Sequence, residues 1–284
     1  GGELKELIFG GPQEELNKTD ITQPAVFTAG VAAWAALREL SGKKLDTALG
    51  GVAGFSLGEY GALVAAGVIS DFSAGLDIVR HRGIFMAEAG RYADGSLRGA
   101  MAAVIGARDD ALAAISAARG SDVLEAVNFN APTQIAVAGD ADAIERLKVT
   151  GKERKLRVIP LKVSTAFHCE VMEPASERLR DYVSSFSFDR PNVKLYANTT
   201  GRDITDGAES SADDYIRGNM ALQLKSPVRW QDTIENMAAD GIGIFIETGP
   251  GKTLCGLVNK ILPDAKTASI DADGLDAALE LLGR

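Results

Sequence analysis

Residues 54–58 read G-x-S-x-G, with Ser56 at the centre. The small apolar run at 49–55 predicts a short strand before the serine, and residues 57–66 predict a helix after it. A serine at such a strand-turn-helix junction is typical of a nucleophile elbow, in which glycines let the backbone turn sharply. The Leu57 amide can then donate to a developing oxyanion. The pattern favours covalent catalysis through Ser56 over a plain glycine-rich turn.

A serine hydroxyl needs a base, because it is a poor nucleophile at neutral pH. The chain has two histidines. His81 stands between Arg80 and Arg82, whose charges disfavour imidazolium, and a surface position is expected for it. His168 follows a strand-like run, residues 164–167, and is expected to lie on a loop, which is a suitable position for a catalytic base. His168 is therefore the predicted base; no carboxylate is identified as a third member, and a backbone or amide carbonyl could orient the ring.

Arg82 lies on a helix predicted from residue 71 to about residue 89, where Ile78, Phe85 and Met86 are spaced to share its face. A helix arginine is usually solvated, but this one has apolar neighbours. The planar, permanently charged guanidinium is well suited to clamp a carboxylate. Arg82 is therefore a candidate to bind an acyl group that carries a second carboxylate.

The elements that position these residues fall into two patterns. Residues 98–162 follow a β-α-β-β-α-β order, which is the split βαβ or ferredoxin-like arrangement. Longer units precede and follow it. A long helix is expected to begin at Gln23-Pro24, because Pro24 suits a first helical turn. The near-continuous apolar run at 242–247 predicts a strand of a buried parallel sheet.

Composition excludes several classes of function. The chain has 284 residues, a net charge of −9 and a pI of about 4.9, which argues against general nucleic-acid binding. No apolar run approaches the roughly 18 residues that a membrane span needs. Two cysteines suggest no disulfide framework, and a reducing cytoplasm is expected.

One stretch departs from the acidic average. Its cations are Lys148, Lys152, Arg154, Lys155, Arg157 and Lys162. The cluster is either an ordinary solvated surface or a docking patch for an acidic partner.

Taken together, these residues resemble the malonyl-CoA:acyl carrier protein transacylases of bacterial fatty acid synthesis. The motifs occur in the family's order over essentially the whole chain: residues 11–19 and 22–24, 54–60, Arg82-Gly83 with Met86, 128–134, 166–168 with Met172, 226–230 and 247–252. The resemblance implies a large domain similar to α/β hydrolases, at 1–97 and 163–284, with a ferredoxin-like insertion at 98–162. It implies malonyl-CoA:acyl carrier protein S-malonyltransferase activity, with malonyl-CoA as substrate and no cofactor. A monomer is expected.

The resemblance also implies roles for single residues. Ser56 would attack the malonyl thioester with His168 as base, and the phosphopantetheine thiol of acyl carrier protein would then take the malonyl group. Arg82 would hold the malonyl carboxylate, and the Leu57 amide would be an oxyanion donor. Gln223 matches the residue whose main-chain carbonyl orients the histidine.

Further residues are assigned by the same resemblance. Met86 belongs to the arginine motif and is a substrate-binding candidate, and Asn130 lies in a segment that lines the cleft. Leu57 and Phe167 match malonyl-type rather than methylmalonyl-type relatives. Acyl carrier protein is acidic, so Lys148, Lys152, Arg154, Lys155 and Arg157 are expected to dock it.

The sequence departs from the family in two places. Phe55 stands where the family usually has histidine, which predicts altered support of the elbow. The family's N-terminal strand and its Gly-Gln-Gly loop have no counterpart, and the chain begins Gly1-Gly2-Glu3 without methionine. A partial version of a longer protein is therefore expected. The missing loop supplies a second oxyanion donor, whose loss typically costs about 10²–10³ in rate.

Three alternatives share some of these features. A serine hydrolase would use the same serine and histidine but has no use for Arg82. A non-catalytic carrier-protein-binding module would bind the partner without becoming acylated. An acyltransferase domain of a polyketide synthase is the third, and the short C-terminus that ends at Arg284 favours a free-standing enzyme instead.

Overall fold

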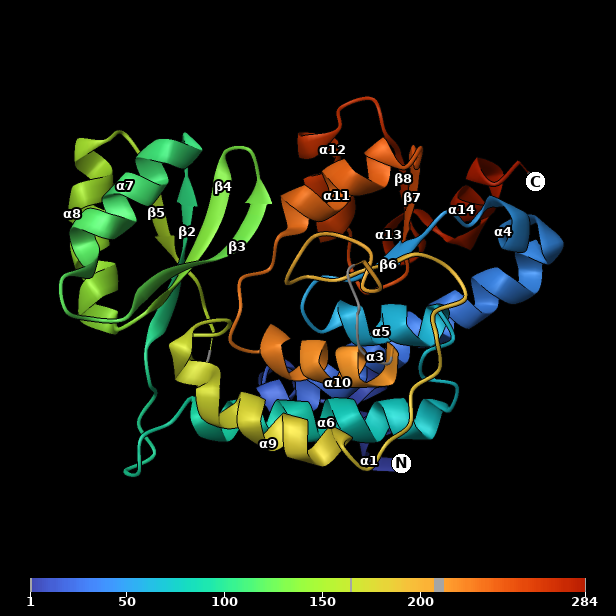
Figure 1. Cartoon of the computed structure of the whole chain (residues 1–284), viewed down its shortest axis with the longest axis horizontal. Coiled ribbons are helices and arrows are strands. Elements are labelled where there is room, and N and C mark those ends of the chain that lie inside the picture. Colours follow the sequence, from blue (N-terminus) through green and yellow to red (C-terminus); the bar gives the residue numbers. More distant parts are fainter. Residues whose placement is uncertain (1, 164, 207–211, 284) are drawn as a thin grey trace.

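The computed structural model describes residues 2–163, 165–206 and 212–283. Ser164, which begins the run predicted to precede His168, lies outside the described residues. Figure 1 shows a small unit beside a larger one, and the larger one is built from the first and last parts of the chain.

Helices make up most of the larger unit (Figure 1). They are α1 (Gly2–Gly10), α2 (Gln13–Leu16), α3 (Thr19–Ser41), α4 (Lys43–Ala48), α5 (Gly58–Ala65), α6 (Phe72–Ala89), α9 (Glu173–Val183), α10 (Ala212–Gln223), α11 (Trp230–Ala239), α12 (Thr253–Ile261), α13 (Ile270–Asp273) and α14 (Leu275–Leu281), with the 3-10 turn η1 (Glu170–Met172) before α9. Among the described helices, none combines the length and the apolar character that a bilayer crossing requires.

The strands of the larger unit form two separate parallel pairs. β1 (Val52–Ala53) pairs with β6 (Leu195–Tyr196), and β7 (Ile244–Glu247) pairs with β8 (Lys266–Ser269). The strand predicted before Ser56 is thus present but short. Because β1 and β6 are parallel, the residues that follow both strands meet at one edge. Ser56 follows β1 at this edge.

An apolar groove of about 450 Å³ lies between the two pairs, lined by β1, β7 and parts of α3, α5 and α12. The parallel pairing predicted for residues 242–247 is confirmed, but the prediction of full burial is wrong. Ile244 is 40% exposed. Among the described residues, β7 has a hydrogen-bonded neighbour on one side only, so its other edge is left uncovered.

The small unit has the predicted order of elements. It contains β2 (Ala100–Ile105), α7 (Arg108–Arg119), β3 (Leu124–Ala131), β4 (Gln134–Gly139), α8 (Ala141–Glu153) and β5 (Arg157–Pro160). The strands form one antiparallel sheet in the order β3-β4-β2-β5. α7 and α8 pack beside each other against this sheet and close a core of their own (Figure 1).

Two helix predictions have different outcomes. α6 begins after Asp71, whose side chain accepts from the amides of Ser73 and Ala74, so the predicted start is confirmed. The start predicted at Gln23-Pro24 is wrong, because α3 already begins at Thr19. The Lys18 carbonyl closes the first turn of α3, and the fixed φ of proline is compatible with the helix that follows.

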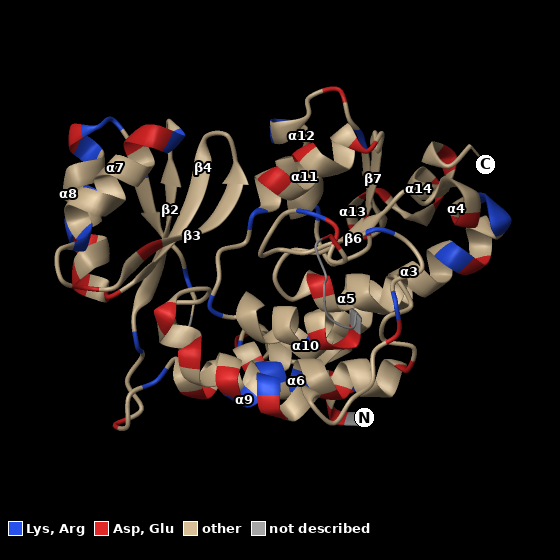
Figure 2. Cartoon of the chain, in the orientation of Figure 1, with Lys and Arg blue, Asp and Glu red and all other residues tan. Residues whose placement is uncertain are grey.

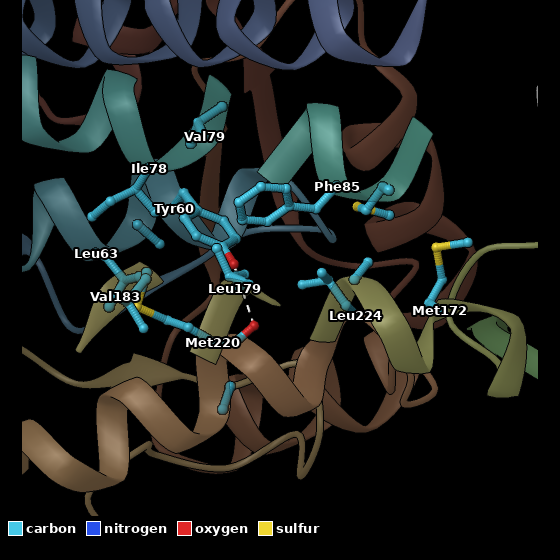
Figure 3. Packing of buried hydrophobic residues seen from close by; sticks show 14 of the residues in the cluster. Tyr60, Leu63, Ile78, Val79, Phe85, Met172, Leu179, Val183, Met220 and Leu224 are labelled. Atoms are coloured by element: carbon cyan, nitrogen blue, oxygen red, sulfur yellow. Dashed lines mark hydrogen bonds between the residues drawn. The ribbon is translucent and has the colours of Figure 1, made fainter. Parts of the chain in front are cut away.

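The main core holds α5 rigidly against its neighbours. Figure 3 shows Tyr60 and Leu63 of α5 packed near Ile78 and Phe85 of α6. The Tyr60 hydroxyl donates to the Met220 carbonyl of α10 at 3.3 Å. Each such large apolar side chain contributes about 1.5–3 kcal/mol when it is fully buried. The helix that follows Ser56 is therefore anchored to both α6 and α10.

Candidate active site

The segment between β1 and α5 is a strained, tight turn. Ser56 has φ of 50°, in the left-handed region, which costs a residue with a side chain about 1–3 kcal/mol. A Cβ on Gly54 would lie 1.9 Å from the carbonyl carbon of Gly58. Only glycine allows the two backbone segments to approach this closely. The strand end and the first turn of the helix therefore fold over each other with Ser56 between them.

Gly54→Ala is expected to lower the midpoint of thermal unfolding strongly or to prevent folding. The added methyl group meets backbone, which cannot move aside like a side chain, so the cost is at least the roughly 1–3 kcal/mol of ordinary overpacking. Gly58→Ala is the matched control, because a Cβ there meets nothing within 4 Å. Circular dichroism melting curves of the two variants measure the difference. Equal midpoints would contradict the geometry of the elbow.

The structure brings Ser56 and His168 together from opposite parts of the chain. Ser56 Oγ lies 2.8 Å from His168 Nε2. His168 Nδ1 lies 2.9 Å from the main-chain carbonyl oxygen of Gln223. A carbonyl only accepts, so Nδ1 carries the proton and Nε2 is left as the acceptor for the serine hydroxyl. The ring is thus oriented to take a proton from Ser56.

His168 is held in its neutral form. Its side chain is buried, and burial together with the nearby Arg82 guanidinium lowers the pKa of His168 to about 4. A neutral imidazole is ready to accept a proton at neutral pH. The structure places His81 elsewhere: its ring stacks on Tyr182 with centroids 4.1 Å apart and its Nδ1 lies 2.9 Å from the Asp77 carbonyl oxygen.

Arg82 is a buried cation beside the serine. It is 1% exposed, and its Nη2 donates to Ser56 Oγ at 3.2 Å and to Gln223 Oε1 at 3.0 Å. Nη1 donates to Gln23 Oε1, while Nε has no partner among the described residues. These three hydrogen-bond acceptors are uncharged, Glu59 acts on the guanidinium through its charge, and burial lowers the pKa of Arg82. A buried cation in this situation favours an incoming carboxylate.

The Leu57 amide lies directly after the nucleophile, at the start of α5. Leu57 directly precedes α5, and no hydrogen bond in the described part of the chain uses its N–H. A free amide at a helix N-terminus carries a partial positive charge. This amide therefore lies next to the serine as a donor for negative charge that develops on a reacting carbonyl.

Phe55 supports the elbow by packing. Its ring meets Trp230 edge to face, with centroids 5.6 Å apart. Such aromatic pairs contribute about 0.5–1.5 kcal/mol beyond area burial. The expected change in the support of the elbow thus takes the form of an aromatic contact with the start of α11.

The other predicted substrate residues are placed as follows. Met86 is buried on α6, and its sulfur lies 3.5 Å from Gln23 Nε2. Phe167 packs partly buried against the main core. Asn130 lies on β3, and its buried Oδ1 has no hydrogen-bond partner among the described residues. Through Gln23, Met86 is linked to Arg82; for Phe167 and Asn130 the structure gives a position only.

The cations of the predicted docking patch lie on the small unit, in α8 and up to the start of β5 (Figure 2). They are Lys148, Lys152, Arg154, Lys155 and Arg157. Two of them already have acidic partners: Lys148 pairs with Glu145 at 2.5 Å, and Arg154 lies 3.9 Å from Asp110.

Two residues at the site were not assigned a role from the sequence. Gln23 of α3 bridges Arg82 and Met86, and it falls within the motif at 22–24. Asn198 follows β6, and its Oδ1 accepts from the Ser56 amide at 2.6 Å. Asn198 comes shortly after β6, which is parallel to β1, and residues that follow neighbouring parallel strands meet at the same edge.

The chain is similar to known proteins over nearly its whole length. Residues 1–271 match the family described as acyl transferase domain. The chain is 42% identical to the malonyl CoA-acyl carrier protein transacylase of Escherichia coli strain K12, over 99% of this chain and 87% of that protein. It is 37% identical to the protein of the same name in Bacillus subtilis strain 168, over 98% of this chain and 84% of that protein. A solved malonyl-transacylase in complex with the type II polyketide synthase acyl-carrier protein AntF is similar with a TM-score of 0.88 and 37% identity, over 98% of this chain and 86% of that chain.

Proposed function

Since the chain belongs to the acyl transferase domain family, we propose that it moves a malonyl group from CoA to the phosphopantetheine thiol of acyl carrier protein through an ester on Ser56. The observation that carries this proposal is the buried Arg82 guanidinium, which touches Ser56 Oγ at 3.2 Å. A malonyl thioester has a carboxylate one methylene away from its reactive carbonyl. A cation beside the nucleophile binds that carboxylate and holds the carbonyl within reach of Ser56.

The first half-reaction forms the ester. His168 Nε2 takes the proton as Ser56 Oγ attacks the thioester carbonyl, and the Leu57 amide donates to the oxyanion. When the tetrahedral intermediate collapses, the carbon–sulfur bond breaks and CoA leaves as a thiol with the proton from His168. The Gln223 carbonyl stabilises the imidazolium through the Nδ1 proton that it already accepts.

The second half-reaction reverses these roles. The carrier protein thiol loses its proton to His168 and attacks the Ser56 ester, and His168 returns the proton to Ser56 Oγ as the new thioester forms. The sequence of two displacements gives ping-pong kinetics. No step requires a cofactor, and malonyl-CoA is the only small-molecule substrate.

The partner and the wider setting follow from the same proposal. Acyl carrier protein is the acceptor, in keeping with the solved complex of a related malonyl-transacylase with its carrier protein. The cations around the C-terminal end of α8 would serve as its docking patch, in which Lys148 pairs with Glu145 and Arg154 lies 3.9 Å from Asp110. The protein would work as a monomer in the cytoplasm, in fatty acid synthesis.

The two units also fit the proposed architecture. The order β-α-β-β-α-β and the antiparallel sheet of the small unit support a ferredoxin-like assignment for residues 98–162. The parallel strand before the elbow supports a similarity of residues 1–97 and 163–284 to α/β hydrolases.

Intact-protein mass spectrometry after brief mixing with malonyl-CoA tests the proposal, with Ser56→Ala as the control. A single malonyl adduct is expected on the wild-type chain and none on the variant. Adding phosphopantetheinylated acyl carrier protein should discharge the adduct much faster than buffer does. Equal rates of discharge with carrier protein and with buffer alone would identify a hydrolase. Carrier-protein binding without any adduct would identify a binding module.

A further inference from the structure

A buried amide clamps the nucleophile elbow from the side. Asn198 is 1% exposed, in the turn that follows β6. Its Oδ1 accepts from the Ser56 amide at 2.6 Å, and its Nδ2 donates to the Gly54 carbonyl at 2.6 Å. The two bonds hold the backbone on both sides of Phe55, as a neighbouring strand would. They stabilise the left-handed conformation that presents Ser56 Oγ.

A buried carboxylate in turn holds Asn198. Glu59 lies on the first turn of α5 and is 1% exposed. One of its oxygens accepts from the Asn198 backbone amide at 2.7 Å, and the other accepts from Asn219 Nδ2 at 2.7 Å. Each oxygen faces an N–H donor, so the ionised carboxylate, which can only accept, matches both contacts, and a proton on either oxygen weakens the contact made there.

We propose that Glu59 is a positioning residue for the acyl transfer: its carboxylate holds Asn198 so that the Asn198 side chain fixes Ser56 Oγ for attack. The inference rests on the proposed function, because it concerns the same serine. It deepens that function by assigning the alignment of the nucleophile to a carboxylate that touches neither the substrate nor His168.

The packing around Glu59 explains why a change in its protonation affects Asn198 and the nucleophile elbow. Tyr60 next to it is anchored among α6 and α10 (Figure 3), so Glu59 has little freedom to move away from Asn198. A change at the carboxylate is therefore passed on to the Asn198 backbone and from there to the elbow.

The charge of Glu59 is expected to change near neutral pH. Burial raises the pKa of Glu59 to about 7, against hydrogen bonds from Asn198, Gln223 and Asn219 and the charge of Arg82. These groups reach it from the turn after β6, from α10 and from α6. The carboxylate is ionised above about pH 7 and protonated below it. The clamp is thus expected to be tight at pH 8 and looser at pH 6.

The test measures how fast Ser56 reacts with phenylmethylsulfonyl fluoride, followed by intact mass. In this reaction the Ser56 Oγ–sulfur bond forms, the sulfur–fluorine bond breaks and His168 takes the hydroxyl proton. The reagent needs an aligned nucleophile but carries no carboxylate for Arg82. Asn198→Ala is expected to slow the reaction by about 10²-fold, as small misplacements of reacting groups do. The KM for malonyl-CoA should stay unchanged.

Asn236→Ala is the matched control. Asn236 Nδ2 donates to the Gly201 carbonyl at 2.8 Å, so it supports the same turn as Asn198 without touching the elbow. It should lower the unfolding midpoint while leaving the rate of Ser56 modification near the wild-type value. If both variants slow the reaction equally, the network is merely structural and the proposal fails.

Glu59→Gln provides a second readout that does not depend on removing a side chain. Its single acceptor oxygen can hold the Asn198 amide if Asn219 turns its own oxygen toward the new NH₂ group. The wild-type rate should rise through a step near pH 7, and the variant should lack this step. The same step in both proteins would overturn the role of Glu59.

The two proposals can fail separately. If the wild-type chain reacts with the sulfonyl fluoride at Ser56 but never accepts malonyl, the proposed function is rejected. The positioning role of Glu59 is then still decided by the modification rates of the Asn198→Ala and Glu59→Gln variants. A wild-type chain that neither reagent modifies would reject both.

Discussion

Arg82→Ala is expected to reduce kcat/KM for malonyl-CoA by about 10²–10³-fold, the usual cost of removing one partner from a buried charge pair. Use of acetyl-CoA should fall far less, because acetyl has no carboxylate to bind. In the free protein the hydrogen bonds of the guanidinium that the described residues show go to uncharged acceptors at Ser56, Gln23 and Gln223. The malonyl carboxylate would be the first charged group to which it donates a hydrogen bond.

Steady-state transfer to acyl carrier protein, measured with both CoA thioesters, checks this expectation. Arg82→Lys should give an intermediate result, since it keeps the charge but loses the planar pair of donors. Arg80→Ala is the matched control, because Arg80 lies on the same helix and is exposed. Equal losses with malonyl-CoA and acetyl-CoA would show that Arg82 supports the fold or Ser56 and does not select the acyl group.

His168→Ala should slow formation of the Ser56 adduct by about 10²–10⁴-fold, the range that a general base contributes. The 2.8 Å contact between Ser56 Oγ and His168 Nε2 is the path for the proton. Rapid mixing with malonyl-CoA followed by intact mass measures the rate directly. His81→Ala should leave it unchanged, because His81 stacks on Tyr182 away from the serine.

The pH dependence of the same reaction gives an independent check on His168. A base works in its unprotonated form, and burial with the Arg82 charge lowers the pKa of His168 to about 4. Its loss of activity should therefore occur near pH 4, well below the step near pH 7 assigned to Glu59. In Glu59→Gln only the lower step should remain. A histidine step near pH 6.5 would mean that the base is solvated and not buried.

The sequence by itself determined the local parts of this protein. The pattern at Gly54, Ser56 and Gly58 predicts the elbow, and the close approach of the backbone at Gly54 shows why the turn needs glycine there. The start of α6 follows from the capping carboxylate of Asp71, and the buried face that carries Arg82 follows from the period of the helix. The element order of the small unit was predictable for the same reason: each element has its own periodicity.

Only the tertiary structure decided which distant groups meet at the serine. Asn198 and Ser56 are 142 positions apart, and Gln223 is 55 positions from the histidine whose Nδ1 proton it accepts. Strand ends and helix faces are brought together by packing, and a single sequence holds no record of these pairings. The exposure at the start of β7 was also decided by the tertiary structure. Its apolar residues predict a buried strand, but the sequence does not show which elements lie beside it. Burial of Glu59, Arg82 and His168, and with it their shifted pKa values, depends on the surrounding helices and not on their neighbours in sequence.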